Sequence, residues 1–120
     1  MKQDERGLPL STDSEEAVRL FDRAVEHYLK YHIDTMSLVG GAIAADPRFV
    51  MAQCLKGYLL LSAANPANNQ QIAATLAVAK AGVGTRRELQ HVAAFEAWAS
   101  GELDRSFAIW REILDEVRPK

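Results

Sequence analysis

The sequence predicts an all-α protein with about six helices, paired into three hairpins that stack as a short, irregular solenoid. Three observations support this fold class. Apolar residues recur at three- and four-residue spacing, no stretch alternates like a half-buried strand, and Gly, Pro and Asn residues interrupt the apolar stretches repeatedly. A length of 120 residues suffices for one domain with its own core.

The amino-terminal segment, residues 1–13, is expected to form an extended arm, and residues 14–120 a single helical domain. Residues 8–10, Leu-Pro-Leu, favour an extended backbone because the residue before a proline avoids helical geometry. We expect this segment to lie on the first helix. That helix begins near Thr12 or Asp13, and the acidic residues that follow suit the positive end of its dipole.

Turn signals separate the later helices. They are a break near Ile33-Asp34, then Asp46-Pro47, Asn65-Pro66, Gly82-Val83-Gly84 and Gly101. The first three of these signals bound two predicted helices, which cover about residues 35–45 and 49–64. Gly40-Gly41 in the former indicates close packing or a bend, and Gly57 in the latter indicates close approach of a neighbouring helix.

The best-defined unit runs from Thr85 to Leu114. Thr85 and Glu88 have the spacing of a capping box, in which the two residues satisfy each other's backbone N–H groups. Gly101 is expected to adopt the left-handed conformation that ends a helix, and a second apolar helix follows. The unit fits one tetratricopeptide (TPR) repeat of ~34 residues, so we expect TPR-like hairpins.

Several short blocks occur in order along the chain: Gly7-Leu8-Pro9-Leu10-Ser11, Glu16-Ala17-Val18 before Phe21-Asp22, Ala45-Asp46-Pro47 with Phe49-Val50-Met51-Ala52, and Thr85-Arg86-Arg87-Glu88 with His91-Val92, then Gly101, Trp110 and Ile113-Leu114. Together they resemble the amino-terminal part of the family of tetratricopeptide repeat protein 38 and its bacterial relatives. The resemblance implies an all-helical, TPR-like protein without an established reaction. Because members of that family are longer, it also implies further helical repeats.

Composition disfavours two classes of partner. The formal net charge of −2 provides no excess of basic residues, so neither nucleic acid nor an anionic membrane is expected as the main partner. The chain has no apolar stretch of ~18 residues that would span a membrane. A single cysteine, Cys54, fits a reducing compartment, and we expect a cytoplasmic protein.

Motifs for catalysis are missing from the sequence. It contains no phosphate-binding loop, no nucleophile elbow and no Cys/His spacing typical of zinc, so we expect no catalytic residue, no metal and no cofactor. The main hypothesis is function by contact, either self-association or binding of a protein or peptide partner whose identity stays open. A TPR register predicts a groove formed by Met51, Cys54, Tyr58, Leu61, Glu88, His91, Phe95 and Trp98.

The last predicted helix carries a wide apolar stripe. At ~100° per residue the stripe spans roughly 160°, more than one neighbouring helix covers. We therefore expect an uncovered edge, available for self-association, at Ile109, Ile113 and Val117. A further repeat, a partner chain or a second copy would cover it, unless the tail or a neighbouring helix of the same chain folds over it.

Two alternatives to a contact function stay open. In the first, the chain is the amino-terminal part of a longer helical protein. Its small-molecule or enzymatic site, among Cys54, Glu88 and His91, is completed by further repeats. Otherwise the chain is a purely structural cap of a longer solenoid. The first alternative requires a pocket that converges on the three side chains, and the second requires a groove filled by the chain's own side chains.

Arg86 and Arg87 are expected in the first turn of a helix, where positive charge opposes the helix dipole. The structural interpretation is that they pair with acids such as Glu88 or Asp46. The functional interpretation is that they bind an acidic partner or a phosphate. We favour the structural interpretation.

Overall fold

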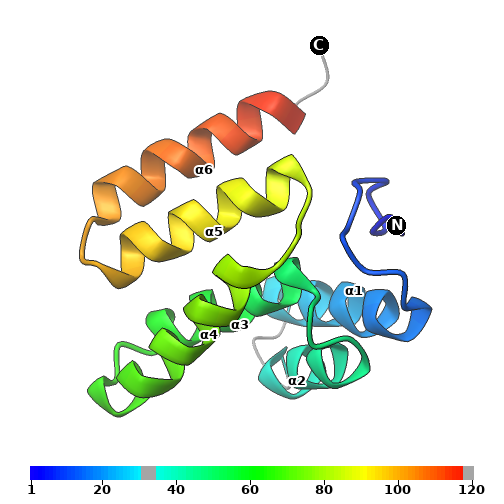
Figure 1. Cartoon of the computed structure of the whole chain (residues 1–120), viewed down its shortest axis with the longest axis horizontal. Coiled ribbons are helices and arrows are strands. Elements are labelled where there is room, and N and C mark those ends of the chain that lie inside the picture. Colours follow the sequence, from blue (N-terminus) through cyan, green and yellow to red (C-terminus); the bar gives the residue numbers. More distant parts are fainter. Residues whose placement is uncertain (31–34, 118–120) are drawn as a thin grey trace.

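The structure is a computed structural model that describes residues 1–30 and 35–117. These residues form α1 (Glu15–Lys30), α2 (Thr35–Ala45), α3 (Val50–Ser62), the short 3-10 helix η1 (Pro66–Asn68), α4 (Asn69–Ala81), α5 (Arg86–Ala99) and α6 (Leu103–Val117) (Figure 1). The predicted all-α class is confirmed. The predicted break near Ile33-Asp34 lies outside the described residues.

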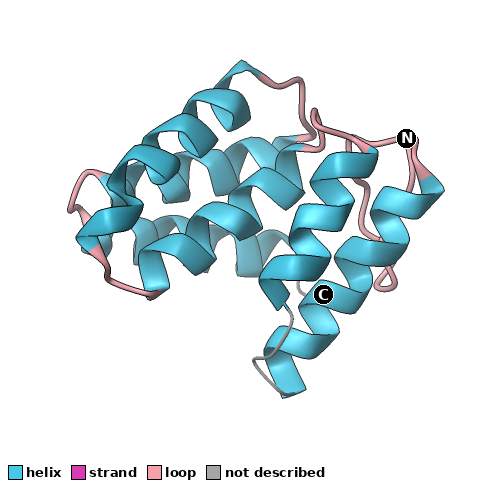
Figure 2. Ribbon diagram, turned by 90° about the horizontal axis from the view of Figure 1, so that it is seen from below, coloured by secondary structure: helices cyan, strands magenta, loops and turns pink. Residues whose placement is uncertain are grey.

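Consecutive helices pack in pairs, α1 with α2, α3 with α4, and α5 with α6. Helix α3 also contacts α2 and α5, so it joins the three pairs. Figure 1 shows α6 at the outer edge of the molecule with α5 beside it, and Figure 2 shows the connecting loops around the rim of the helices. No helix in the described part of the chain has both the length and the apolar character needed to cross a membrane.

Local signals set most helix boundaries as predicted. The start of α1 is an exception, because the Ser14 hydroxyl, and not Thr12 or Asp13, accepts from the Ala17 N–H at 3.1 Å. The Thr85 hydroxyl accepts from the Glu88 N–H at 3.2 Å, while the Glu88 carboxylate accepts from the Thr85 N–H at 2.9 Å, which confirms the capping box. Gly101 has φ +82° and terminates the α5 segment in the left-handed region, where glycine is favoured. Helix α2 ends before Asp46-Pro47, because proline cannot continue a helical hydrogen-bond ladder.

The amino-terminal arm is not simply extended, as the sequence suggested, but folds back on itself. The Leu10 N–H donates to the Lys2 carbonyl at 2.8 Å, and the turn between them contains Gly7 with φ +79°. Asp4 stabilises this turn, since its Oδ1 accepts from the N–H groups of Arg6 at 2.9 Å and Leu8 at 3.0 Å. The predicted position against the first helix is confirmed by Leu10, which is fully buried in one cluster with α1 residues.

The core has two parts. The larger cluster joins the arm, α1, α2 and α3, and its largest side chains include Phe21 and Phe49, whose ring centroids lie 5.3 Å apart. A smaller cluster of Leu60, Ile72 and Phe95 joins α3, α4 and α5. Helix α3 therefore buries side chains toward neighbours on several sides, which explains why it is apolar around much of its circumference.

Candidate interaction surface

Half of the predicted groove is not open. Met51, Cys54, Glu88 and Phe95 are buried, so the groove prediction is wrong at these four positions. The physical reason is close packing of α3 on α5 and on the arm. Tyr58, Leu61, His91 and Trp98 remain half-buried, and only these residues of the predicted groove retain part of their side-chain surface.

Tyr58 ties α3, α5 and α6 together. Its hydroxyl lies 2.9 Å from His91 Nδ1, 3.0 Å from the His91 carbonyl oxygen and 3.2 Å from Trp110 Nε1. A phenol has one donor and two acceptor sites. All three contacts are satisfied if Tyr58 donates to the carbonyl and accepts from Trp110 Nε1–H and from a His91 that carries its proton on Nδ1. The Tyr58 ring also stacks on Trp98 at 6.1 Å, so Tyr58 is a structural residue rather than a free groove wall.

His91 is expected to make the stability of the fold depend on pH. Burial, and then the positive charge of Arg87, lower its pKa from 6.5 to about 4. The folded state therefore keeps the imidazole neutral, whereas the unfolded chain protonates it near pH 6.5. The free energy of unfolding should therefore be highest above pH 6.5. It should fall by about 3 kcal/mol in total as the pH drops from 6.5 toward 4.

Urea unfolding of the chain at pH 7, 6 and 5 measures this dependence. The matched control is His91→Gln, which removes the titrating group but keeps a polar side chain near Tyr58. We expect the control to be less stable at pH 7 and to lose little more between pH 7 and 5. An equal slope in both proteins over this interval would assign the pH dependence to other groups.

Glu88 is a second junction, which the capping box alone did not predict. Its Oε2 accepts from the Met51 N–H at 3.2 Å and from the Ser11 hydroxyl at 3.1 Å. Phe49 precedes α3 and its side chain cannot accept a hydrogen bond from the first turn of the helix. The Glu88 carboxylate of α5 accepts instead from the N–H of Met51, the second residue of α3. Glu88 thus joins α5, the start of α3 and the arm.

The three residues of the enzymatic alternative, Cys54, Glu88 and His91, do not share a pocket. Cys54 is fully buried, and burial, followed by the charge of Glu88, raises the pKa of its thiol far above the usual value. The Glu88 carboxylate is engaged by backbone and Ser11 donors, and the hollow that His91 lines is lined by neither of the other two residues. These three positions therefore do not converge as the enzymatic alternative requires.

The two arginines of the first turn of α5 have acidic partners, although not the ones anticipated. Arg86 Nη2 lies 2.8 Å from Glu116 Oε1 on α6, at the surface. Arg87 Nη2 lies 3.6 Å from Asp4 Oδ2 of the arm, and this pair is largely buried. Arg87 Nε and Nη2 form no hydrogen bond within the described residues. Both contacts link α5 to another segment, in agreement with the structural interpretation.

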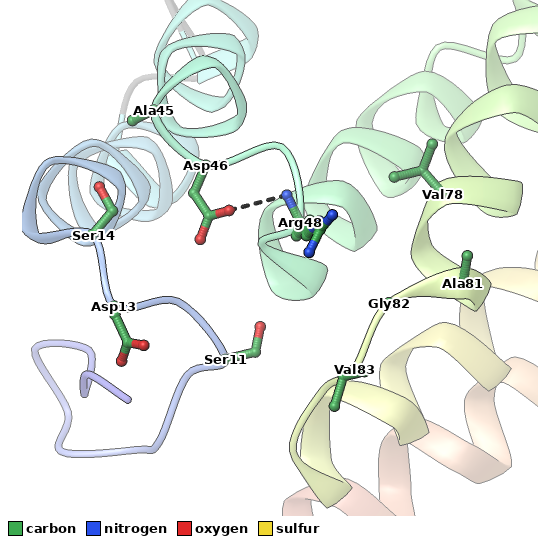
Figure 3. A pocket seen from close by; sticks show the side chains of 10 residues that line it. All are labelled: Ser11, Asp13, Ser14, Ala45, Asp46, Arg48, Val78, Ala81, Gly82 and Val83. Carbon is green, nitrogen blue, oxygen red and sulfur yellow. Dashed lines mark hydrogen bonds between the residues drawn. The ribbon is translucent and has the colours of Figure 1, made fainter.

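Two hollows flank the arm. The larger, of about 670 Å³, lies between the polar residues Asp13, Asp46 and Arg48 and the end of α4 (Figure 3). Its carboxylates serve local structure, since Asp46 accepts from the Arg48 N–H at 3.0 Å and from the Thr12 hydroxyl, and Asp13 pairs with the amino terminus. The other, of about 430 Å³, is mainly apolar and lies between the arm, α1 and α6.

The uncovered face of α6 differs from the predicted edge. Ile113 is buried and Ile109 half-buried against the rest of the molecule, so the prediction was wrong for Ile113 and only Val117 of the predicted edge is exposed. The exposed apolar residues and their exposed fractions are Leu103 (39%), Phe107 (54%), Leu114 (59%) and Val117 (39%). These four residues and the half-buried Trp110 between them are termed the α6 face below.

Comparisons with known proteins do not place the chain in a family. No model of a known protein family matches the sequence, and a search of the solved structures finds no match for the chain.

Proposed function

We propose that this chain is a TPR-like helical module that acts by contact with another protein, and that the α6 face is its contact surface. The observation that carries the proposal is the exposure of four large apolar side chains on one side of a single helix. Contiguous exposed apolar surface is characteristic of interaction sites, whereas scattered single residues are not. Half-buried Trp110, in the middle of this surface, adds an aromatic residue of the kind enriched at such sites.

The packing of the helices supports the TPR-like part of the proposal. Each of the pairs α1/α2, α3/α4 and α5/α6 is a helix hairpin, and neighbouring hairpins touch through α2 with α3 and through α3 with α5. In a stack of hairpins the terminal hairpin has one neighbour, so its outer helix requires either a polar surface or a partner. Among the described residues, helix α6 is the outer helix of the α5/α6 hairpin and is not polar on this face.

Site-specific photocrosslinking tests the proposal. Benzoyl-phenylalanine replaces Phe107 in the full chain, the native host cells are irradiated, and the adducts are identified by mass spectrometry. The control carries the same group at Ala108, which is exposed on α6 but lies outside the α6 face. We expect one reproducible partner from position 107 and not from 108. Equal, non-selective adducts from both positions, or none from 107, would contradict the proposal.

A further inference from the structure

The α6 face has the spacing of a coiled-coil seam. Its residues, Leu103, Phe107, Trp110, Leu114 and Val117, follow one another at alternating intervals of four and three positions. Apolar residues at this alternating spacing form the narrow stripe by which one helix packs along another, with each side chain entering a hole of the facing helix. The surface is therefore suited to an α-helix.

This seam borders the side of α6 that packs on α5, and Trp110 belongs to both, because its ring also contacts Trp98 of α5. Ser106 and Ile113 are buried on that side, and the Ser106 hydroxyl donates to the Ala94 carbonyl of α5 at 2.8 Å. At ~100° per residue, the centre of the seam lies about 60–80° away from these two residues. Leu103, Phe107 and Leu114 are the exposed seam residues that lie farthest from Ser106 and Ile113, so a helix placed along them would lie beside α6 without displacing α5.

The charges beside the seam select the partner. Asp104 and Arg111 lie on the flank of the seam that faces away from α5, and both are exposed. Neither forms an ion pair within the part of the chain that the structure describes. One is acidic and the other basic, and they lie seven positions apart, so this flank is complementary to a reversed copy of itself.

An antiparallel alignment of two α6 helices satisfies both features. Leu103 then lies opposite Leu114 of the second copy, and Phe107 lies opposite Trp110. The same alignment places Asp104 beside Arg111 of the second copy, and the two-fold symmetry repeats each contact. The opposed helix dipoles add a favourable contribution. A parallel alignment would provide neither these charge pairs nor opposed dipoles.

We propose that the partner of the α6 face is a second copy of this chain, in a symmetric dimer with antiparallel α6 helices. The inference rests on the proposed contact function and names the occupant of the same surface. In this arrangement the apolar seam supplies the affinity, and the two Asp104–Arg111 pairs fix the direction.

Sedimentation equilibrium of the full chain over a range of concentrations is the first test. We expect a monomer–dimer equilibrium, with the dimer weakened at least 100-fold by Phe107→Glu combined with Leu114→Glu. Both residues are exposed, so circular dichroism should show an unchanged fold. The matched control is Val78→Glu, an exposed apolar position on α4, which should leave the dissociation constant within about twofold.

Charge exchange tests the direction of the helices. Asp104→Arg alone or Arg111→Asp alone creates two like-charge contacts in the antiparallel dimer and should weaken it about tenfold. The double variant restores opposite pairs and should return the dissociation constant to within about threefold of the parent chain. Single variants without effect, or a double variant that is weaker than both singles, would overturn the antiparallel arrangement.

The two tests separate this inference from the proposed function. A chain that stays monomeric, while position 107 crosslinks a different protein in cells, would overturn the second copy as partner and leave the contact function intact. A monomeric chain without crosslinks from position 107 would overturn both. A dimer that persists after Phe107→Glu and Leu114→Glu would show that the copies associate through another surface, and would overturn the inference.

Discussion

Replacing Glu88 by alanine is expected to lower the free energy of unfolding by about 3–5 kcal/mol, because the carboxylate serves three segments at once. The substitution removes the acceptor for the N–H groups of Thr85 and Met51 and for the Ser11 hydroxyl. Glu88 is fully buried, so water does not replace these interactions without opening the structure. An unsatisfied buried donor costs about 1–3 kcal/mol, and the space left by the side chain adds to the loss.

Denaturant unfolding, followed by circular dichroism, measures the effect of Glu88→Ala. Glu96→Ala is the matched control, since Glu96 lies on the same helix but forms a partly exposed ion pair with Lys80. An exposed pair contributes about 0–1 kcal/mol, so the control should lose at most that amount. If Glu88→Ala lost no more than Glu96→Ala, the buried carboxylate would not be the junction described above.

The sequence predicted the helix boundaries well because the signals that set them are local. The Thr85/Glu88 pair lies within four residues, Gly101 ends α5 by its own φ angle, and Pro47 blocks continuation of α2 by its own ring. None of these interactions requires knowledge of how the helices are arranged in space. The all-α class and the positions of the breaks within the described residues follow from such signals alone.

The faces of the helices could not be predicted in the same way. Helix α3 is apolar around much of its circumference, so periodicity does not distinguish Met51 and Cys54, which are buried, from half-buried Leu61. On α6, the choice between Ile113 and Leu114 as the covered residue depends on where α5 lies beneath a stripe that is wider than one contact. Spacing indicates that a stripe exists but does not indicate which of its edges has a neighbour.

Polar interactions between distant segments could not be predicted from the sequence for a related reason. Three such interactions join segments that are far apart along the chain. They are the hydrogen bonds accepted by the Glu88 carboxylate, the Arg87–Asp4 ion pair and the hydrogen bonds of the Tyr58 hydroxyl. A residue type indicates that a partner is needed when the group is buried, but not which partner the packing supplies. The arginines were therefore correctly expected to meet acids, while Glu88 and Asp46 were the wrong acids.

Gly57→Ala is expected to destabilise the fold by about 3 kcal/mol, although alanine is intrinsically the better helix former. A Cβ atom at this position would lie only 2.2 Å from Phe95 Cζ, and because Phe95 is fully buried, its ring would have to shift within the core. The predicted close approach of a neighbouring helix at Gly57 is thus confirmed, and its cause is one aromatic side chain.

Gly40→Ala is the matched control, because Gly40 also lies inside a helix but a Cβ there would meet no atom within 4 Å. Relief from the poor helix propensity of glycine should stabilise this variant by up to about 1 kcal/mol, so the two glycines should give changes of opposite sign. Combining Gly57→Ala with Phe95→Leu should restore part of the loss, since the smaller side chain vacates the space beside residue 57. Additive losses in the double variant, or the same sign at both glycines, would show that steric contact with Phe95 does not determine the effect at Gly57.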